Sequence, residues 1–441
     1  MTKLAGQSIL DSLAGRFEAF EKSLNGQSKS AIHQVRKAAF ASLNQTGFPH
    51  AKHEEYKFTN LTKALEKNID FGANERSANL TNEEIESVKI AGLDAYNLVF
   101  LNGHYSPNLS DKVSEEGLSI ETFQGSSADN VEELTSQFGQ IASFEDNAFI
   151  ALNTAFSQNG VVIKVDKGAV ISKPIALYFI GETKNEQLFY NVRNLISVSE
   201  TAQVTILEKF DTIGSEKAFT NVVNEVSVAA SANTKYFKLE DDADHTYHIS
   251  NVKVNQAKDS TFTANTIALN GAMVRNNLDI RLEDEGCEAN MNGLYVLSGK
   301  THVDNHTVVD HLKPNCNSNE LYKGIMDDKT KGVFNGKIFV RQDAQKTNAF
   351  QSNKNILMTN DATVNTKPQL EIWADDVKCS HGCTTGQLDP DAMFYLQARG
   401  IRKERARAIL LHAFASDVIE NLELEPVQEH VERIIADRLE R

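Results

Sequence analysis

The feature that most constrains the fold is a long stretch, between Asn159 and Trp373, composed almost entirely of strand-like runs. These runs are rich in Val, Ile, Thr, Phe and Tyr, and almost no 3.6-residue helical periodicity occurs among them. Several alternate polar and apolar residues, as half-buried strands do. No proline lies between Pro174 and Pro314, so nothing there interrupts a hydrogen-bonded ladder. The clearest runs are Val161–Val165, Ile175–Ile180, Gln203–Lys209, Val222–Val228, Lys235–Glu240, Ile249–Val254, Thr261–Leu269, Leu278–Leu282, Leu294–Leu297 and Val333–Val340.

Successive runs in the second half of this core recur at a nearly constant interval. They begin near His248, Thr261, Val274, Cys287 and Thr301, in steps of 13, 13, 13 and 14 residues. A strand-only region with such a repeat favours a β-solenoid, in which each coil stacks on the previous one. A large β-sandwich or jelly roll is the alternative, although it should contain more Pro-Gly hairpin signals than this sequence does.

Helical patterns precede the β core. Apolar residues three or four positions apart predict one helix from Ile9 to Leu24, ended by Asn25-Gly26, and a second from about Ser30 to Leu43. Thr81 and Glu84 have the spacing of a capping box at the start of another helical turn. Two short strands are expected over 97–103 and 118–123. Residues 1–145 are therefore predicted to form a mixed helical and α/β region.

A small helical domain is predicted after Gly386. Apolar residues follow i, i+3, i+4 spacing from Ala406 to Ile419, and a second stripe follows Pro426. The predicted division of the chain is an N-terminal region over 1–145, a β core over 146–386 and a C-terminal helical domain over 387–441.

Composition limits the classes of function. With 45 Lys and Arg against 60 Asp and Glu, the net charge of −15 disfavours binding to nucleic acids. No apolar run is long enough to cross a membrane, and the first residues lack the apolar segment of a secretory signal. Four cysteines in 441 residues are not a disulfide framework, so we expect reduced thiols and a cytoplasmic protein.

Common catalytic motifs are absent or incomplete. The segment from Gly293 to Thr301 resembles a phosphate-binding loop, but five residues separate its glycines where the motif has four. The residues between them also read as a strand, so we expect no nucleotide on this chain. The patterns G-x-S-x-G and H-E-x-x-H do not occur, which argues against the hydrolases and zinc enzymes that carry them.

Two clusters remain as candidate sites, and the first is His302, Asp304 and His306. On a strand these three side chains share one face, where they could hold a divalent metal. A β-solenoid metalloenzyme is therefore one hypothesis. The simpler interpretation, which we favour, is a polar face of the solenoid whose imidazoles bond to neighbouring coils.

The second cluster, Cys379-Ser-His381-Gly-Cys383, is the densest group of soft ligands in the chain. Thiolate and imidazole together suit iron, zinc or sulfur chemistry. A cysteine beside a histidine can have a lowered pKa and act as a nucleophile or persulfide carrier. Three ligands within five residues cannot easily surround one metal ion, so residues of a partner would be needed.

The sequence around this cluster resembles the signature of the SufB/SufD family of iron–sulfur cluster assembly proteins. Within the family the chain is most similar to SufD. Ser352 stands where SufB has a cysteine thought to accept sulfur, and His381 stands where SufB has a carboxylate. Cys383 departs from the family, which usually has alanine there. The resemblance covers nearly the whole chain and is carried by residues 47–49, 55–59, 149–156, 347–355, 367–382 and 386–401.

The resemblance implies a fold and a set of partners. The implied fold is an N-terminal helical region, a right-handed parallel β-helix and a C-terminal helical domain. The implied role is a non-enzymatic scaffold subunit that pairs with SufB through the end of the β-helix. Cys379 and His381 would lie at that interface and share a transient iron–sulfur cluster with the partner, while a homodimer of the isolated chain is left open. The SufC ATPase would bind the C-terminal helical domain, with expected contacts at Phe394, Tyr395, Arg399, Gly400 and Ile401.

Overall fold

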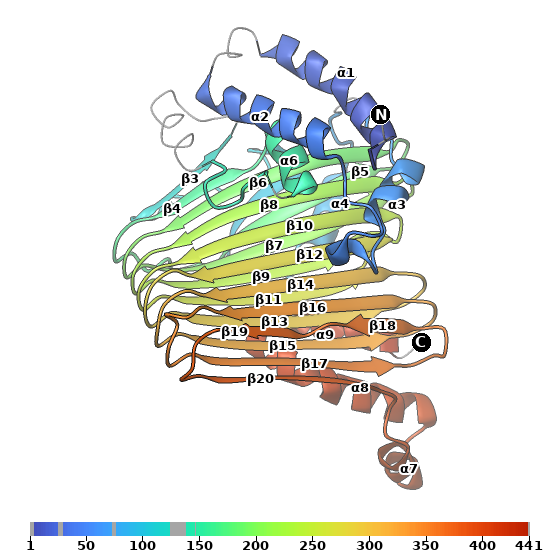
Figure 1. Ribbon diagram of the computed structural model, residues 1–441. Coiled ribbons are helices and arrows are strands. Elements are labelled where there is room, and N and C mark those ends of the chain that lie inside the picture. The colour runs from blue at the N-terminus through green and yellow to red at the C-terminus, as the bar shows by residue number, and fades with distance from the viewer. Residues whose placement is uncertain (1–3, 25–29, 73–75, 124–137, 146, 440–441) are drawn as a thin grey trace.

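The protein is a parallel β-solenoid with helices from both ends of the chain packed on its sides (Figure 1). The computed structural model describes residues 4–24, 30–72, 76–123, 138–145 and 147–439. Both the mainly β core and its helical flanks are as the sequence predicted, and the sandwich alternative is wrong. The predicted helix end at Asn25-Gly26 lies outside the described residues.

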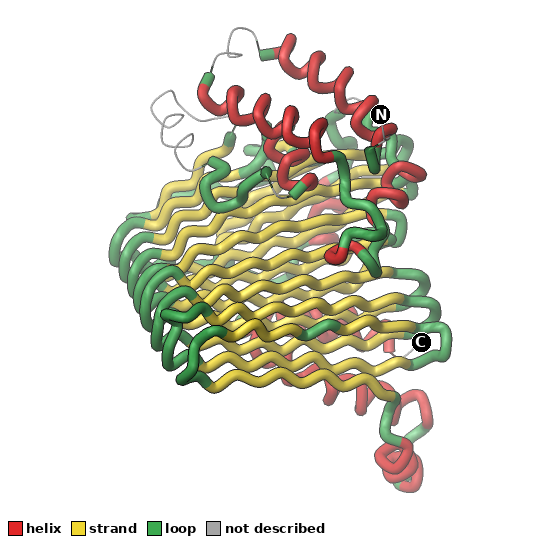
Figure 2. Tube along the Cα trace, in the orientation of Figure 1, coloured by secondary structure: helices red, strands yellow, loops and turns green. Residues whose placement is uncertain are grey.

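Each coil contributes one strand to each of two sheets, here called sheet A and sheet B (Figure 2). Sheet A contains, in spatial order, β2 (His104–Tyr105), β1 (Tyr96–Leu101), β5 (Ile175–Thr183), β7 (Gln203–Gly214), β9 (Asn233–Asp241), β11 (Thr261–Asn270), β13 (Glu288–Leu297), β15 (Asn317–Met326), β17 (Asn348–Leu357) and β20 (Lys378–Gly386). Sheet B contains β18 (Thr363–Thr366), β16 (Lys331–Val340), β14 (His302–His311), β12 (Met273–Leu282), β10 (Thr246–Gln256), β8 (Ala218–Val228), β6 (Leu188–Val198), β4 (Val161–Val165) and β3 (Leu118–Thr122), with β19 (Gln369–Ile372) also paired to β16.

The strand register explains the recurrence seen in the sequence. Met273 of β12 pairs with His302 of β14, which pairs in turn with Lys331 of β16, so one full coil here spans 29 residues. The interval of 13 to 14 residues is therefore half a coil, the distance from a strand in one sheet to the next strand in the other. Because neighbouring coils stay in register, each residue lies directly above its counterpart in the previous coil.

Apolar side chains fill the space between the two sheets. On β5, Ile175, Leu177 and Phe179 belong to this central core, whereas the alternate residues Ala176 and Tyr178 face outward into a second apolar cluster. Both faces of the strand are thus buried, which is why such strands read as almost continuous hydrophobic runs.

Most N-terminal helices cover the outer face of sheet B, whereas Ile85 of α4 (Asn82–Val88) belongs to the apolar cluster outside sheet A. Helix α6 (Ala148–Ala155) contacts β6 and β8, and α2 (Ala31–Thr46) packs on α6. Helix α1 (Gln7–Ser23), α3 (Leu61–Asn68) and the short helix η2 (Glu54–Tyr56) complete this layer. The predicted capping box is confirmed at the start of α4 (Asn82–Val88), where Thr81 accepts from the backbone of Glu84 and the Glu84 carboxylate accepts from the backbone of Thr81.

The C-terminal helices cover the outer face of sheet A. Helix α8 (Lys403–Ile419) contacts β13 and β15, while the short helix η3 (Glu420–Leu422) leads into α9 (Glu425–Leu439). Helix α7 (Pro390–Ala398) buries none of its side chains and projects from the end of the solenoid (Figure 1). Within the described ranges, no helix has the length and apolarity needed to cross a membrane.

Candidate functional site

Strand β20, which carries the predicted cysteine–histidine cluster, is the last strand of sheet A. It pairs with β17 along one edge, and no other strand of the described chain pairs with its opposite edge (Figure 1). Cys379 lies beside Ala349, and His381 lies beside Gln351. Because side chains alternate along a strand, Cys379, His381 and Cys383 share one face. The structure thus brings both predicted residues to an open end of the solenoid.

The opposite sheet is interrupted where it would face His381. Strand β18 ends at Thr366 and β19 begins at Gln369, both beside β16. Pro368 falls between them, and proline has no N–H with which to continue a ladder. The coil that contains His381 is therefore incomplete on the side of sheet B, and the imidazole is exposed.

Cys379 occupies a less reactive setting than the sequence indicated. Its half-buried side chain packs against an apolar cluster that includes Val340, Ala344 and Ala374. This burial raises the pKa of the Cys379 thiol, although a backbone hydrogen bond at Ala349 opposes the shift. The suggestion that a neighbouring histidine lowers this pKa is thus wrong for the chain by itself, because the thiol faces apolar side chains instead of a cation.

Cys383 bonds to the end of sheet B. Its exposed thiol lies 2.9 Å from Oγ1 of Thr366, on β18, and 3.8 Å from Oδ1 of Asn353, on β17. The contact with Thr366 links the last strand of sheet A to the last strand of sheet B.

A polar ladder that the sequence analysis missed lies beneath His381. Glu320 of β15, Gln351 of β17 and His381 of β20 occupy the same position in three successive coils. Gln351 Nε2 donates to Glu320 Oε2 at 2.7 Å, and Thr307 Oγ1 donates to Glu320 Oε1 at 2.5 Å. Burial raises the pKa of Glu320 to about 7. The signal that could have revealed this ladder is the coil-length spacing of Glu320, Gln351 and His381.

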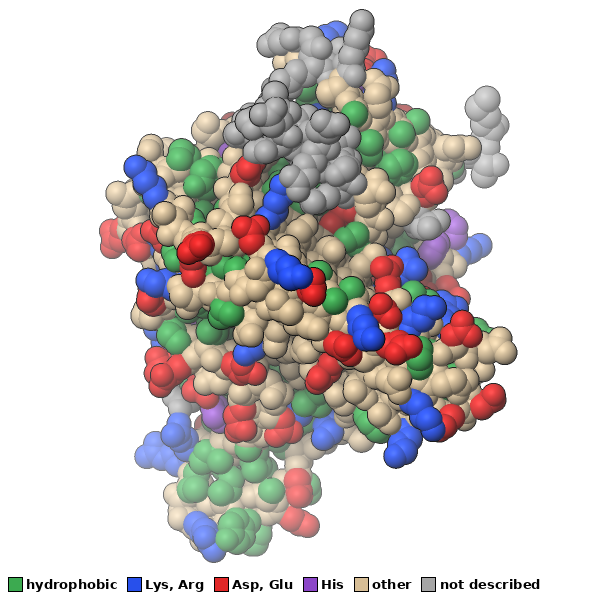
Figure 3. Space-filling model, turned by 90° about the vertical axis from the view of Figure 1, so that its left-hand side faces the viewer, with side chains coloured by type: hydrophobic (Ala, Val, Ile, Leu, Met, Phe, Trp, Pro, Cys, Tyr) green, Lys and Arg blue, Asp and Glu red, His purple; other side chains and the backbone are tan. Residues whose placement is uncertain are grey.

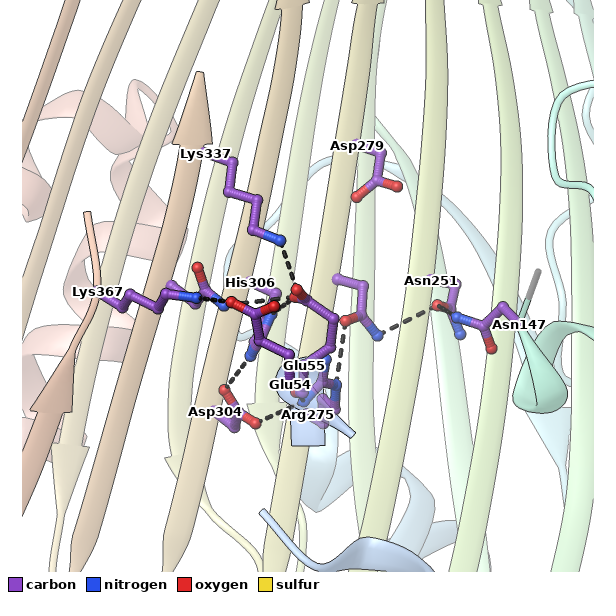
Figure 4. A network of polar contacts seen from close by, with 12 residues as sticks. Glu54, Glu55, Asn147, Asn251, Arg275, Asp279, Asp304, His306, Lys337 and Lys367 are labelled. Atoms are coloured by element: carbon purple, nitrogen blue, oxygen red, sulfur yellow. Dashed lines mark hydrogen bonds and ion pairs between the residues drawn. The ribbon is translucent and has the colours of Figure 1, made fainter. Parts of the chain in front are cut away.

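His302, Asp304 and His306 do share one face of β14, as predicted, and their polar atoms bond to neighbouring side chains; Figure 4 shows the contacts of Asp304 and His306. His302 Nε2 lies 2.9 Å from Thr59 Oγ1. His306 Nε2 lies 2.9 Å from Asp304 Oδ1, and its Nδ1 lies 3.3 Å from Glu55 Oε2. The three side chains therefore fasten the N-terminal segment to sheet B.

Arg275 completes this network from β12. Its Nη1 donates to Asp304 Oδ2 at 2.8 Å, and its guanidinium lies over the ring of Tyr56, 4.0 Å from the centroid. Although burial opposes it, His306 and Arg275 hold the pKa of Asp304 below its usual range. No group of three or more His, Cys, Asp or Glu side chains among the described residues could hold a metal ion, so the metalloenzyme hypothesis is not favoured.

The five residues expected to contact an ATPase lie on α7 and just after it. Phe394 is 72% exposed and Tyr395 is 54% exposed, which is unusual for aromatic side chains. The Arg399 guanidinium stacks on the Tyr395 ring at 4.1 Å. Gly400 has a φ of 84° and Ile401 follows it into the turn before α8. Figure 3 shows apolar side chains gathered on the lobe that projects at this end of the molecule.

The chain also matches known proteins over nearly its whole length. The description "SufBD protein N-terminal region" matches residues 8–177, and "SUF system FeS cluster assembly, SufBD core domain" matches residues 179–414. The chain is 33% identical over 399 residues to the iron–sulfur cluster assembly protein SufD of Escherichia coli K12, covering 90% of each chain. It is 30% identical over 424 residues to an iron–sulfur cluster assembly SufBD family protein of Synechocystis, covering 94% of this chain and 93% of the relative. The chain therefore belongs to the SufBD family of iron–sulfur cluster assembly proteins of the SUF system, as a SufD-like member.

Proposed function

We propose that this chain is a non-enzymatic scaffold subunit that pairs with a SufB-like partner and builds a nascent iron–sulfur cluster at their interface. The observation that carries the proposal is the open end of the solenoid, where β20 holds Cys379 and His381 and one edge of the strand pairs with no other strand that the structure describes. An unpaired strand edge offers N–H and C=O groups to a strand of another chain. A partner with a matching edge would continue sheet A across the interface.

The proposed site supplies half of a coordination shell. A thiolate and a neutral imidazole are suitable ligands for iron, and the partner would contribute the remaining groups. Because burial raises the pKa of Cys379, its thiol keeps its proton until iron binds, and coordination of the thiolate to iron then releases that proton. Assembly would therefore depend on the paired state, since this chain alone offers too few ligands.

A SufC-like ABC ATPase would bind the C-terminal helices. The exposed aromatic side chains of α7 support this docking position, because a helix that buries nothing within its own chain needs another surface to cover it. Helix α8 is fastened to sheet A by Lys323 of β15, whose Nζ donates to Asp417 Oδ2 at 2.5 Å and to the Phe414 carbonyl at 2.6 Å. Movement of the helices during ATP hydrolysis would thus displace β15, which is separated from β20 and the proposed site by one strand.

The free cysteines support our proposal that the protein acts in a reducing compartment. We infer a cytoplasmic location from the four cysteines, none of which is paired in a disulfide.

The test is cluster assembly by the complex of this chain with SufB-like and SufC-like partners. We expect Cys379→Ala and His381→Ala each to reduce the amount of cluster formed without preventing formation of the complex. Ser380→Ala, on the opposite face of the same strand, is the matched control and should retain assembly. Full assembly by both site variants would reject the site, and failure of the wild-type chain to bind the partners would reject the scaffold role.

A further inference from the structure

Gln351 is held in one orientation directly beneath His381. Its side chain is 3% exposed and lies between the two sheets, opposite Gly336 of β16. A Cβ atom at position 336 would lie 2.1 Å from Gln351 Nε2, so only glycine leaves room for the amide. Thr307 and Gly336 are register neighbours in sheet B, as Glu320 and Gln351 are in sheet A. In two successive coils, the polar ladder therefore lies between a residue of sheet A and the residue of sheet B that faces it.

The chemistry of Glu320 sets which end of the amide points down the ladder. Above its raised pKa Glu320 is ionised, and a carboxylate only accepts hydrogen bonds; in this form Glu320 accepts from both Thr307 and Gln351. Gln351 must therefore present its NH₂ group to Glu320. Its carbonyl oxygen, Oε1, is then left over, and among the described residues this buried atom has no hydrogen-bond partner. A buried unsatisfied acceptor is costly, so a donor is expected near it.

The next residue in the ladder can supply that donor. His381 occupies the position of Gln351 in the following coil, and adjacent strands are separated by about 4.8 Å. A neutral imidazole carries one N–H and one lone pair. Histidines that bind metals commonly donate their other N–H to a carbonyl or carboxylate, which fixes the tautomer and the ring orientation.

We propose that Gln351 is a positioning residue for His381, in which Oε1 accepts the ring N–H and leaves the lone pair of the other ring nitrogen at the open edge of β20. The chain Thr307–Glu320–Gln351–His381 then runs from the interior of the solenoid to its exposed end, each donor facing an acceptor. Glu320 orients the amide, and the amide orients the imidazole. This inference rests on the proposed function, because Gln351 would orient the same histidine that we propose as an iron ligand.

The test reads the tautomer of His381 in the isolated full-length chain, without iron or partners. Histidine labelled with ¹⁵N reports which ring nitrogen carries the proton, and the signals of His381 are identified by their loss in His381→Asn. At pH 8, where Glu320 is ionised, we expect one tautomer in the wild-type chain. In Gln351→Met, which keeps the length but removes the acceptor, we expect a mixture of both tautomers.

Two further variants separate positioning from damage to the core. Gly336→Ala displaces the Gln351 amide without changing Gln351, and it should produce the same mixture. The exchange Glu320→Gln with Gln351→Glu restores a donor facing an acceptor, and it should restore a single tautomer. If folded Gln351→Met and Gly336→Ala both keep the wild-type tautomer, the proposal is wrong. If Gln351→Met does not fold, the tautomers in Gly336→Ala and in the exchange variant test the proposal: a wild-type tautomer in Gly336→Ala, or a mixture in the exchange variant, would show that it is wrong.

The same variants distinguish this proposal from the proposed function. In the complex, Gln351→Met should weaken iron binding by about 10- to 100-fold, the usual effect of removing a partner of a ligating histidine. If His381→Ala retains full cluster assembly while the tautomer in the wild-type chain still depends on Gln351, the proposed function is wrong and the positioning role of Gln351 is supported. If His381→Ala abolishes assembly but the tautomer is the same with and without Gln351, only the positioning role is wrong.

Discussion

Glu55 and Lys337 are 282 residues apart in the sequence, yet Glu55 Oε1 and Lys337 Nζ form an ion pair of 2.5 Å (Figure 4). Glu55 also faces His306 through its second carboxylate oxygen. Hydrogen bonds from His306 and Lys337 lower the pKa of Glu55 to about 2, against the opposing effect of burial. One carboxylate thus joins the N-terminal segment to two coils of sheet B.

Glu55→Gln should destabilise the folded chain by about 1–3 kcal/mol at pH 7, because it removes hydrogen bonds to a charged group. The folded-state pKa lies below the unfolded value, so the wild-type advantage is present above about pH 4.5. It should disappear as the pH falls toward 2. Urea unfolding at a series of pH values measures this difference. The control is Glu54→Gln, whose exposed pairing with Lys367 should contribute nothing measurable; equal effects of the two variants would contradict the prediction.

Glu320 should give the opposite pH dependence. Because burial raises its folded-state pKa from 4.5 to about 7, the folded chain binds a proton more tightly than the unfolded chain does. The wild-type chain should therefore lose stability relative to Glu320→Gln as the pH rises from about 4.5 to 7, by up to about 3 kcal/mol. The readout is the difference in unfolding free energy between the two chains at each pH. A difference that does not change over this range would show that Glu320 titrates normally.

The four cysteines should react with iodoacetamide in an order set by their exposure. Cys383 is exposed and should be alkylated first, whereas the half-buried Cys379, with its raised pKa, should react more slowly and gain rate above about pH 9. Cys287 and Cys316 are fully buried and should react only after unfolding. Mass spectrometry of the peptides follows each site. Adding a SufB-like partner should protect Cys379, and equal labelling with and without a partner that binds would place Cys379 outside the interface.

Replacing Phe394 and Tyr395 with alanine should weaken binding of a SufC-like ATPase by about tenfold or more, the effect of removing aromatic anchors from an interface. The thermal unfolding midpoint should stay the same, because α7 buries no side chain within the chain. Calorimetric titration with the purified ATPase measures the affinity. Phe350→Ala is the matched control, since this exposed aromatic residue lies on sheet A. Unchanged affinity in the double variant would move the docking surface away from α7.

Much of the fold could be predicted because its causes are local. Runs of β-branched and aromatic residues, the absence of proline and the half-coil recurrence together indicated a solenoid, and the Thr81–Glu84 capping box was visible in four residues. The length of a full coil could not be read in the same way. The recurrence alone does not say whether each run pairs with the next run in the sequence or with the one after it. The pairing of Met273 with His302 shows that it is the one after it.

The candidate site was predicted in its residues but not in its environment. Cys379 and His381 stood out by type and spacing, and both lie at the open end. The raised pKa of Cys379 depends on Val340 and Ala374, which other strands and turns bring against it. Likewise, the ladder beneath His381 exists only because three coils stack in register.

Local chemistry thus determined which segments become strands or helices and which side chains can bind soft metals, since backbone preference and side-chain type are properties of neighbouring residues. The tertiary structure alone decided which of the two ligand clusters stays accessible. His306 is paired with Asp304 and Glu55, while His381 remains at an edge that no strand of the described chain covers. The reason is physical: Coulomb attraction and hydrogen bonding act over a few ångströms, and only the stacking of coils sets which distant residues come within that range.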